Sequence, residues 1–346
     1  MDKILCLIHD DGNYYHFEGS HKTIPTKLAN ESLNYFVISE FNNKKNIELF
    51  EGDLRDNWPE SDVICHFYTK SINQSFFNSH DTKSSDFKDW VNEAKELFQT
   101  GELQKVVLSA IKKIPWKAEP EKIIYAFRQL IHQNPEAFAC LIFSEIFGIW
   151  IGLSPEFLVR LENGFITSMS LAGTREVRED NWTSEEVWGY KELEEQAIVT
   201  KYIEDFLIKK GTKGLRISGP YTFRNGLIEH LRTDFSGQLP SYRRNEILLH
   251  ALELHPTPAV CGTPVEISKN FILTHEKHTR ELFTGFWGFV SSKITKLYVN
   301  IRCFKVLPEE VLLYAGAGIT PLSNSDEEWL EIRRKMRVSA SVLQRT

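Results

Sequence analysis

Short apolar runs separated by polar joints dominate the first part of the chain, a pattern typical of strands connected by turns. Within the first 80 residues it predicts five strands, at KILCLI, NYYHFEG, NYFVISEF, NIELF and VICHFYT. Residues 70–86 are polar and have the composition of a linker. From Ser85 to Gly101 apolar residues recur at helical spacing, which predicts a helix.

Beyond residue 100 the same patterns predict a mixture of hairpins and helices. Further helices are expected at 119–133, 184–210, 241–252, 265–280 and 325–343, the last with a capping box formed by Ser325 and Glu328. Strands are expected at 105–115, 138–153 (one or two), 157–169 (a hairpin), 214–223, 226–239, GFWGFVSS, KLYVNIRCFKVL and EEVLLYAGAGI. Because helices do not alternate strictly with strands, we expect an α+β fold with antiparallel sheets and helices outside.

Composition narrows the classes of partner. Lys and Arg number 41 and Asp and Glu 47, so the formal net charge is 41 − 47 = −6, and the pI near 6.0 gives no basic field for nucleic acid. No apolar run reaches about 18 residues, so no membrane-spanning helix is expected. The five cysteines are scattered and lack a C-x-x-C pair, and the N-terminus lacks signal-peptide features. We therefore expect a cytoplasmic protein with reduced thiols.

Two acidic helix faces are candidates for a metal site. Glu192 and Glu195 lie three residues apart on one predicted helix, and Glu328 and Glu331 do so on the last, where Lys335 follows on the same face. If these faces meet, their oxygens would favour Mg²⁺ over softer metals. The alternative is that both faces are solvated, as Glu-rich helix faces commonly are.

Three single charges interrupt otherwise apolar strands or strand ends: Lys105, Glu156 and Arg302. Burial lowers the pKa of a lysine and raises that of a glutamate, which would create a base and an acid near neutral pH. Exposure at strand ends is the alternative. The glycine turns LAGTR (171–175) and AGAGIT (315–320) follow predicted strands and offer backbone N–H groups to an anion.

The histidines differ in their surroundings. HEKH (275–278) lacks the spacing of a zinc-protease motif, so we interpret it as a surface helix face. His132 and His230 are interpreted as structural. His255 lies between prolines in LHPTPAV, where Pro256 and Pro258 make the loop rigid, and this makes it a better candidate for a functional role.

Eight motifs together identify a resemblance to the chorismate-utilising enzymes. In order they are KVVLS (105–109), GLSPEFLVR (152–160), SLAGTR (170–175), KELEEQAIV (191–199), LHPTPAVCGTP (254–264), GFWGFV (285–290), VNIRCFKV (299–306) and AGAGITPLSNSDEEWLEIRRK (315–335). The resemblance covers residues 85–343, and residues 1–80 look like an abbreviated N-terminal β-rich part. It implies one catalytic domain over 1–346, with two antiparallel sheets around a core and helices outside.

Within this family three positions favour the isochorismate synthases. Lys105 stands where they carry a lysine that activates water, and HPTPA (255–259) is similar to their loop. Ala172 stands where aminodeoxychorismate synthases carry a nucleophilic lysine, which argues against that activity. A salicylate synthase, which also eliminates pyruvate, and a catalytically silent chorismate-binding protein remain as alternatives.

The resemblance also implies roles for the candidate residues. Lys105 would be the general base that activates water for attack at C2 of chorismate, and Glu156 the general acid for the departing C4 hydroxyl. Mg²⁺ would be held by Glu195 and Glu331, with Glu192 and Glu328 in support. The implied substrate-binding residues are Arg302, Lys335, His255, Gly173, Thr174, Gly316 and Gly318.

The sequence departs from the family pattern at Ala110, Ser170 and Cys261, which leaves the shape of the binding site open. The resemblance favours a monomer that feeds menaquinone or siderophore biosynthesis. The sequence does not distinguish these pathways from each other or from a salicylate pathway.

Overall fold

The computed structural model describes residues 2–22, 33–42, 47–73, 80–176, 188–225, 228–240 and 243–343. The helices are α1 (Ser61–Ser71), α2 (Ser84–Gln99), α3 (Pro120–Gln133), α4 (Tyr190–Lys209), α5 (Arg244–Leu254), α6 (Val265–His275) and α7 (Ser325–Ala340). Within these ranges no helix is both long and apolar enough to cross a membrane.

The strands are β1 (Lys3–Asp10), β2 (Asn13–Lys22), β3 (Tyr35–Ser39), β4 (Glu48–Asp56), β5 (Lys105–Pro115), β6 (Phe138–Ser144), β7 (Gly148–Ser154), β8 (Phe157–Glu162), β9 (Phe165–Glu176), β10 (Lys213–Asn225), β11 (Ile228–Gln238), β12 (Gly262–Thr263), β13 (Phe286–Val290), β14 (Ile294–Val299), β15 (Arg302–Val306) and β16 (Glu310–Ile319). Most of the predicted strands are confirmed in type and position. The α+β class with antiparallel pairing is confirmed as well.

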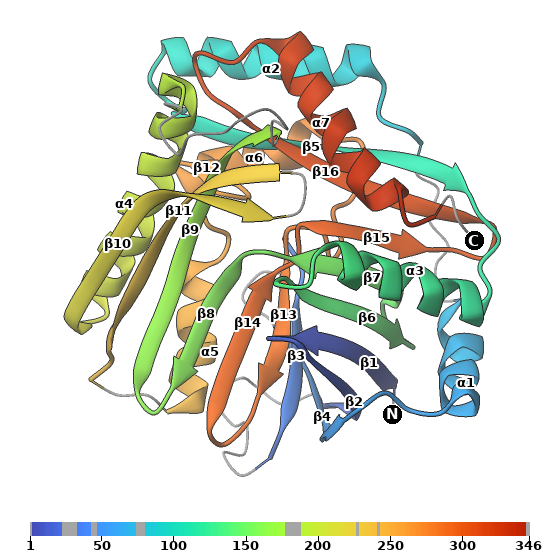
Figure 1. The fold of residues 1–346 in the computed structure, drawn as a ribbon. Helices are drawn as coiled ribbons and strands as arrows, with labels where there is room; N and C mark the ends of the chain where they lie inside the picture. The colour runs from blue at the N-terminus through green and yellow to red at the C-terminus, as the bar shows by residue number, and fades with distance from the viewer. Residues whose placement is uncertain are drawn as a thin grey trace, which may run out of the picture.

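The prediction of two separate sheets requires correction. All the strands form one antiparallel hydrogen-bonded series in the order β10-β11-β9-β8-β14-β13-β3-β4-β2-β1-β6-β7-β15-β16-β5-β12. We call β10 to β13 of this order the first wing and β6 to β12 the second wing. The strands β3, β4, β2 and β1 join the wings, as Figure 1 shows. The apolar pattern of these N-terminal strands does not reveal that β3 pairs with β13 of the first wing and β1 with β6 of the second.

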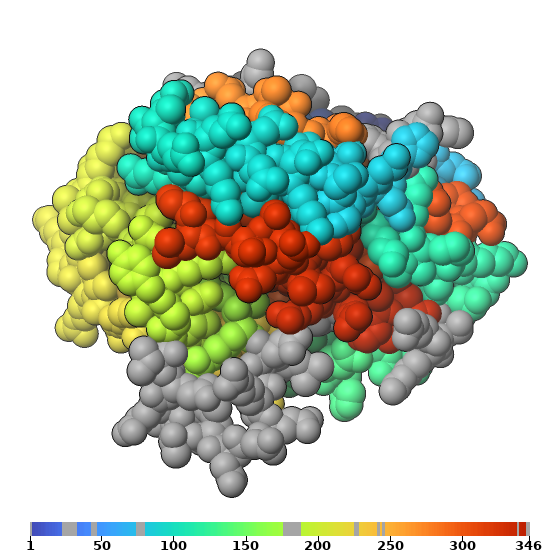
Figure 2. Space-filling view, turned by 90° about the horizontal axis from the view of Figure 1, so that it is seen from above, coloured from blue at the N-terminus to red at the C-terminus, as the bar shows by residue number. Residues whose placement is uncertain are grey.

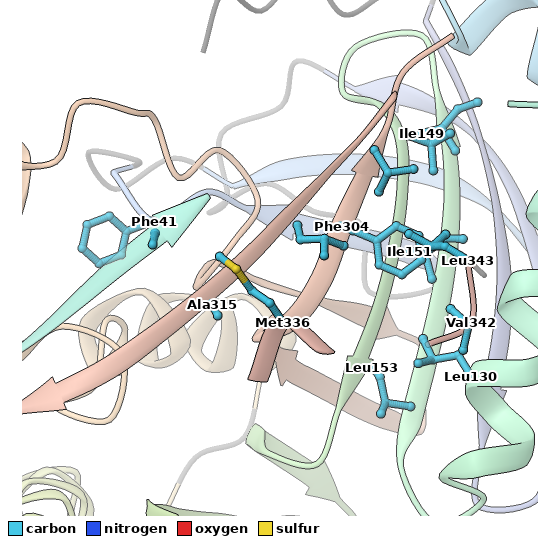
Figure 3. Packing of buried hydrophobic residues seen from close by; sticks show 14 of the residues in the cluster. Phe41, Leu130, Ile149, Ile151, Leu153, Phe304, Ala315, Met336, Val342 and Leu343 are labelled. Atoms are coloured by element: carbon cyan, nitrogen blue, oxygen red, sulfur yellow. The ribbon is translucent and has the colours of Figure 1, made fainter. Parts of the chain in front are cut away.

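Apolar side chains form three clusters, one between the wings and one on the outer face of each. The cluster between the wings includes Trp150 of the second wing and Trp287 of the first, both nearly inaccessible to solvent. Helices α4 and α5 cover the first wing, whereas α1, α2, α3 and α7 cover the second. Figure 3 shows Ile151 of β7 and Met336 of α7 within the second outer cluster. Burying apolar surface on both faces of the sheet is the main stabilising contribution to this fold.

The chain crosses between the wings four times: twice by way of α5 and α6, and twice through short connections that lie beside each other. We call these two short connections the crossings. It leaves the second wing between β7 and β8, at Glu156, and returns to it between β14 and β15, at Ile301. The backbone N–H of Val299 donates to the carbonyl of Glu156 at 3.1 Å. The run KLYVNIRCFKVL, predicted as one strand, is therefore two strands, because its apolar residues serve two different wings.

Three further predictions are wrong at the local level. VICHFYT belongs to helix α1, whose buried Ile64 and Phe67 are spaced three apart as a helix face requires. The last helix is capped by Asn324 rather than Ser325, since the Asn324 side chain accepts from the amides of Asp326 and Glu327. Helix α6 ends at His275, five residues before the predicted end.

Five predicted segments lie partly outside the described residues. Three of them do so by one or two positions only: 46 in NIELF, 226–227 in the predicted 226–239 strand and 241–242 in the predicted 241–252 helix. Of the predicted 184–210 helix, positions 184–187 fall there, and α4 begins at Tyr190. Of the predicted linker 70–86, positions 74–79 fall there, and its two ends belong to α1 and α2.

Candidate functional site

A cleft opens where the ends of the two wings face each other. It encloses about 850 Å³ of empty space, part of it open to solvent. Its walls come from β5, β9, β11, β16, helices α4 and α7, and both crossings between the wings. The lining includes nine of the predicted site residues: Glu156, Gly173, Thr174, Glu195, Arg302, Gly316, Gly318, Glu331 and Lys335.

Lys105 lies directly behind the wall and contacts a lining carboxylate. Its side chain is fully buried, and its Nζ lies 2.8 Å from Oε1 of Glu195 on α4. Gly318 of β16 separates the two elements: a Cβ atom there would lie 2.2 Å from Glu195 Oε1 and 3.2 Å from Lys105 Cε. A side chain at position 318 would therefore displace the Glu195 carboxylate from this contact.

Glu156 is protonated more readily than an ordinary glutamate. Its pKa is raised to about 8 because burial removes the carboxyl from water, an effect that the positive charge of Lys105 only partly offsets. Burial also acts on Glu195, but there the charges of Lys105, Lys191 and Lys335 outweigh it, and the net pKa is lowered. The cleft thus places a neutral carboxyl group and an ionised one around the same lysine.

The two predicted acidic helix faces do meet, and Glu195, Glu328 and Glu331 each lie beside a lysine. Helices α4 and α7 lie next to each other in the surface view of Figure 2, and Lys191 of α4 forms an ion pair with Glu328 of α7. On α7, Lys335 contacts Glu331 at 2.7 Å, and its Nζ donates to the carbonyl of Gly316 at 2.9 Å. The sequence reasoning missed Lys191, although it stands inside the KELEEQAIV motif.

The residues fit a magnesium ion in their chemistry. Oε2 of Glu328 is buried and has no hydrogen-bond partner among the described residues. The pKa of this carboxyl is raised by burial and by the negative charge of Glu331, a repulsion that a divalent cation would relieve. With the side chains as placed, however, no three His, Cys, Asp or Glu residues of the described part converge closely enough to hold a metal. Glu195, Glu328 and Glu331 instead face lysines.

Arg302, in the lining of the cleft, has a buried N–H donor without a hydrogen-bond partner among the described residues. Its Nη2 donates to Nε2 of His230 at 2.8 Å, while Nη1 is buried without a hydrogen-bond partner among the described residues. Since Nε2 of His230 accepts, Nδ1 carries the proton and donates to the carbonyl of Gly173 at 2.9 Å. Burial, with the charge of Arg302, lowers the pKa of His230 to about 3, so this imidazole is neutral. His230 was interpreted as only structural; the structure places it in the lining.

Two predictions about other histidines need correction. His255 does not line the cleft within the described residues; its Nε2 lies 2.8 Å from the carbonyl oxygen of Thr284, and its ring packs against Phe286. HEKH is not a surface helix face, because Glu276 and His278 are buried at 2% and 3% side-chain exposure beyond the end of α6. Helical periodicity alone did not reveal where that helix ends.

The remaining predicted residues lie just outside the lining. The Cβ of Glu192 packs 3.1 Å from the position that a Cβ on Gly173 would occupy, at a positive φ of 65° that favours glycine. Ala110 and Cys261 are buried away from the cleft. Ser170 bonds Gln196 of α4 through its hydroxyl at 2.8 Å. These three departures from the family pattern therefore change packing behind the walls.

Comparison with known proteins finds the same family along nearly the whole chain. A family model described as "Chorismate binding enzyme" matches residues 13–344. Isochorismate synthase EntC of Escherichia coli K12 is 32% identical over 262 residues, covering 74% of this chain and 66% of EntC. Isochorismate synthase DhbC of Bacillus subtilis is 30% identical over 267 residues, covering 73% of this chain and 66% of DhbC. The matched region thus spans just under two thirds of these relatives.

Solved structures share the fold. A putative 2,3-dihydroxybenzoate-specific isochorismate synthase, DhbC of Bacillus anthracis, has a TM-score of 0.81 at 23% identity, covering 98% of this chain and 96% of its own. Anthranilate synthase component I of Streptococcus pneumoniae has a TM-score of 0.68 at 16% identity, covering 99% and 92%. At these identities the similarity establishes the fold, which enzymes with different products share.

Proposed function

The chain belongs to the chorismate-binding enzyme family, and from that premise we propose that it is an isochorismate synthase that uses Mg²⁺. The reaction adds water at C2 of chorismate and expels the C4 hydroxyl, with an allylic shift of the double bond. One observation carries the proposal: Lys105 and Glu156 are buried at the same cleft, close enough for the lysine charge to act on the glutamate. The similarity to EntC and DhbC supports the choice of reaction.

Glu156 is the general acid. With a pKa raised to about 8 by burial, it carries a proton at neutral pH that it can donate to the departing hydroxyl. An unburied glutamate would be ionised and would have none to give. Its position at the crossing between β7 and β8 fixes the carboxyl against the lining of the cleft.

Lys105 is the general base that takes a proton from the attacking water. Its 2.8 Å ion pair with Glu195 must open, and the Nζ ammonium must release one proton, before Nζ can accept a proton from water. The Glu195 side chain therefore has to turn to another partner. In the substrate complex the acid and the base then act from different parts of the cleft, one on the leaving oxygen and one on the entering oxygen.

Arg302 and Lys335 recognise the carboxylates of the substrate. The unpartnered Nη1 of Arg302 is a buried donor at the cleft wall, which a carboxylate oxygen would satisfy. Lys335 contributes a point charge beside Gly316 of β16. Gly173 and Thr174 belong to the same lining, and His230, which donates to the Gly173 carbonyl, keeps Arg302 in place.

Glu195 and Glu331, supported by Glu192 and Glu328, would hold the magnesium ion. When bound, the ion supplies a positive charge that orients a substrate carboxylate and withdraws electron density from the ring. The protein contributes the carboxylates from two helices, and Lys191 and Lys335 balance their charge before metal enters. We expect a monomeric enzyme without nucleic-acid or membrane partners, which serves menaquinone or siderophore biosynthesis.

Product analysis tests this proposal. The purified protein is incubated with chorismate, with Mg²⁺ or with a chelator, and the products are separated by chromatography. We expect isochorismate in equilibrium with chorismate, and only when Mg²⁺ is present. Salicylate with pyruvate would establish the salicylate synthase alternative, and no conversion would favour a silent chorismate-binding protein.

A further inference from the structure

We infer that Arg280, held by Glu276, is a positioning residue that completes the open edge of β5 and fixes three segments of the cleft wall. Both residues lie in the segment between α6 and β13, which includes the HEKH motif. The catalytic consequence rests on the proposed function, whereas the positioning itself does not.

The outer edge of β5 has almost no strand to pair with. On one side β16 pairs along ten residues, but on the other β12 pairs only at Lys105 and Val106. The amide of Val107 still donates to the carbonyl of Cys261, and side chains then serve the next backbone groups of β5 up to Ser109. Arg280 Nη2 donates to the carbonyl of Val107 at 2.6 Å, and the amide of Ser109 donates to Glu276 Oε1 at 2.7 Å. Buried backbone groups need such partners, so the ion pair acts in place of a missing strand.

Arg280 uses every N–H donor of its guanidinium group. Nε and one Nη2 hydrogen donate to Glu276, and the other Nη2 hydrogen donates to Val107. The two Nη1 hydrogens reach the carbonyl of Val260 at 2.9 Å and Oγ1 of Thr284 at 3.3 Å. Arginine alone offers five donors in a fixed plane. A lysine could keep the charge but could not reach all four partners.

The partners of Arg280 belong to the cleft. Val107, Val260 and Thr284 all line it, and they come from β5, from the LHPTPAV loop and from the segment before β13. Val107 is also two residues from Lys105 on the same face of β5. Arg280 therefore sets the position of the strand that carries Lys105 relative to two other wall segments.

The surroundings keep the ion pair dry and rigid. Glu276 and Arg280 are both nearly buried, and the guanidinium carbon lies 4.3 Å from the ring centroid of Phe41, which follows β3. Nε2 of His278 lies 2.9 Å from Oγ of Ser109, a second connection from the same segment to β5. Where water is excluded, a hydrogen bond between charged groups is strong, and removing one partner leaves the other charge buried and unpaired.

The test compares Arg280→Lys with a matched ion-pair variant far from the cleft. Lys296→Met removes another largely buried pair, that of Lys296 with Asp10, which has no residue in the lining. Each protein is assayed well below its own melting temperature. We expect kcat/KM for chorismate to fall about 10- to 100-fold in Arg280→Lys, with kcat lowered and KM raised. Lys296→Met should stay within about twofold of wild type at a comparable loss of Tm, since it lies off the cleft. Unchanged kcat and KM in Arg280→Lys would overturn the inference.

Amide hydrogen exchange tests the positioning without any substrate. Peptides that cover 105–111 and 257–263 should exchange faster in Arg280→Lys than in wild type or Lys296→Met. Glu276→Gln, which keeps an acceptor for Ser109 but removes the counter-charge of Arg280, should act in the same direction and serves if Arg280→Lys does not fold. If the wild type does not convert chorismate, the proposed function fails and the exchange result still decides the positioning. Equal exchange in all four proteins contradicts it.

Discussion

Glu156 and Glu195 are two glutamates of one cleft that sit in opposite electrostatic states. Burial raises the pKa of Glu156 to about 8, and the charge of Lys105 only partly opposes this rise. Burial acts on Glu195 too, but a 2.8 Å contact with Lys105 and the charges of Lys191 and Lys335 lower its pKa. The same type of side chain keeps its proton in one place and is ionised in the other because the number of nearby cations differs.

This difference follows from the elements that carry the two residues. Glu156 lies at the crossing between the wings, where apolar strands surround it. Glu195 lies on α4, which faces α7 across a set of lysines and glutamates. The proposed proton donor and the proposed metal ligand have opposite electrostatic requirements. The sheet carries the first residue, and one of two facing helices carries the second.

Lys105 is the cation that acts on both Glu156 and Glu195, so its removal tests the comparison most strongly. Lys105→Ala eliminates the proposed base, so we expect turnover to fall by about 10²- to 10⁴-fold while chorismate binding largely persists. Single-turnover kinetics and calorimetric binding of chorismate measure the two effects separately. Activity above about a tenth of wild type would contradict the assignment of Lys105 as the base.

Glu195→Gln changes the ionised member of the pair only. We expect the Mg²⁺ concentration for half-maximal activity to rise about tenfold or more, because a charged oxygen ligand is lost. Equilibrium titration of Mg²⁺ by calorimetry provides a measurement that does not depend on turnover. An unchanged titration would place the metal elsewhere.

Glu156→Gln replaces the neutral carboxyl group of the pair. Its effect on the free energy of unfolding, measured against pH, shows how the two glutamates differ. The pKa of Glu156 is raised in the folded state, so its contribution to stability is present below its ordinary value of 4.5 and is lost as pH rises through about 8. Between these values the wild type should lose up to about 1.4 kcal/mol per pH unit relative to Glu156→Gln. Urea unfolding at several pH values measures this slope.

Glu195→Gln is the control for that experiment. The folded-state pKa of Glu195 is lowered, so its contribution is present above the ordinary value and disappears only as pH falls further. The difference between wild type and Glu195→Gln should therefore be flat over the range in which the Glu156→Gln difference changes. Equal slopes for the two variants would mean that the two carboxyl groups do not differ as described.

The smallest effect is expected at His230, which touches Arg302 without touching either glutamate. His230→Phe removes the acceptor for Arg302 Nη2, and one hydrogen bond of this kind is worth about 0.5–1.5 kcal/mol. We expect KM for chorismate to rise about 2- to 12-fold, with kcat nearly unchanged. A large fall in kcat with an unchanged KM would show that His230 acts in the chemistry itself.

Much of the fold was predictable from periodicity, and the failures have local causes. Strand alternation identified β5 and the hairpin of β8 and β9, and helical spacing identified α2 and α3. VICHFYT failed because five of its seven residues are hydrophobic, and so short a run satisfies either period. KLYVNIRCFKVL failed because a run of apolar residues does not reveal a change of wing at Ile301.

Most residues of the predicted site were found through motifs. The residues that hold them in position were not predicted. Glu156, Glu195, Arg302 and Lys335 were identified, and the structure gathers them in one cleft. The positioning residues His230, Glu276 and Arg280 were missed or misread, because their importance depends on backbone groups that only the fold brings near. Sequence spacing reveals which side chains can react more readily than it reveals what holds them.

Isotopic labelling tests the central claim, addition of water at C2 with loss of the C4 hydroxyl, most directly. The protein is incubated with chorismate and Mg²⁺ in H₂¹⁸O, and the isochorismate formed in the first few per cent of conversion is analysed by mass spectrometry. We predict one ¹⁸O atom per molecule, located at the C2 hydroxyl, and no product with Lys105→Ala on the same time scale. Isochorismate without the label would contradict the account, since its hydroxyl would then have migrated without water.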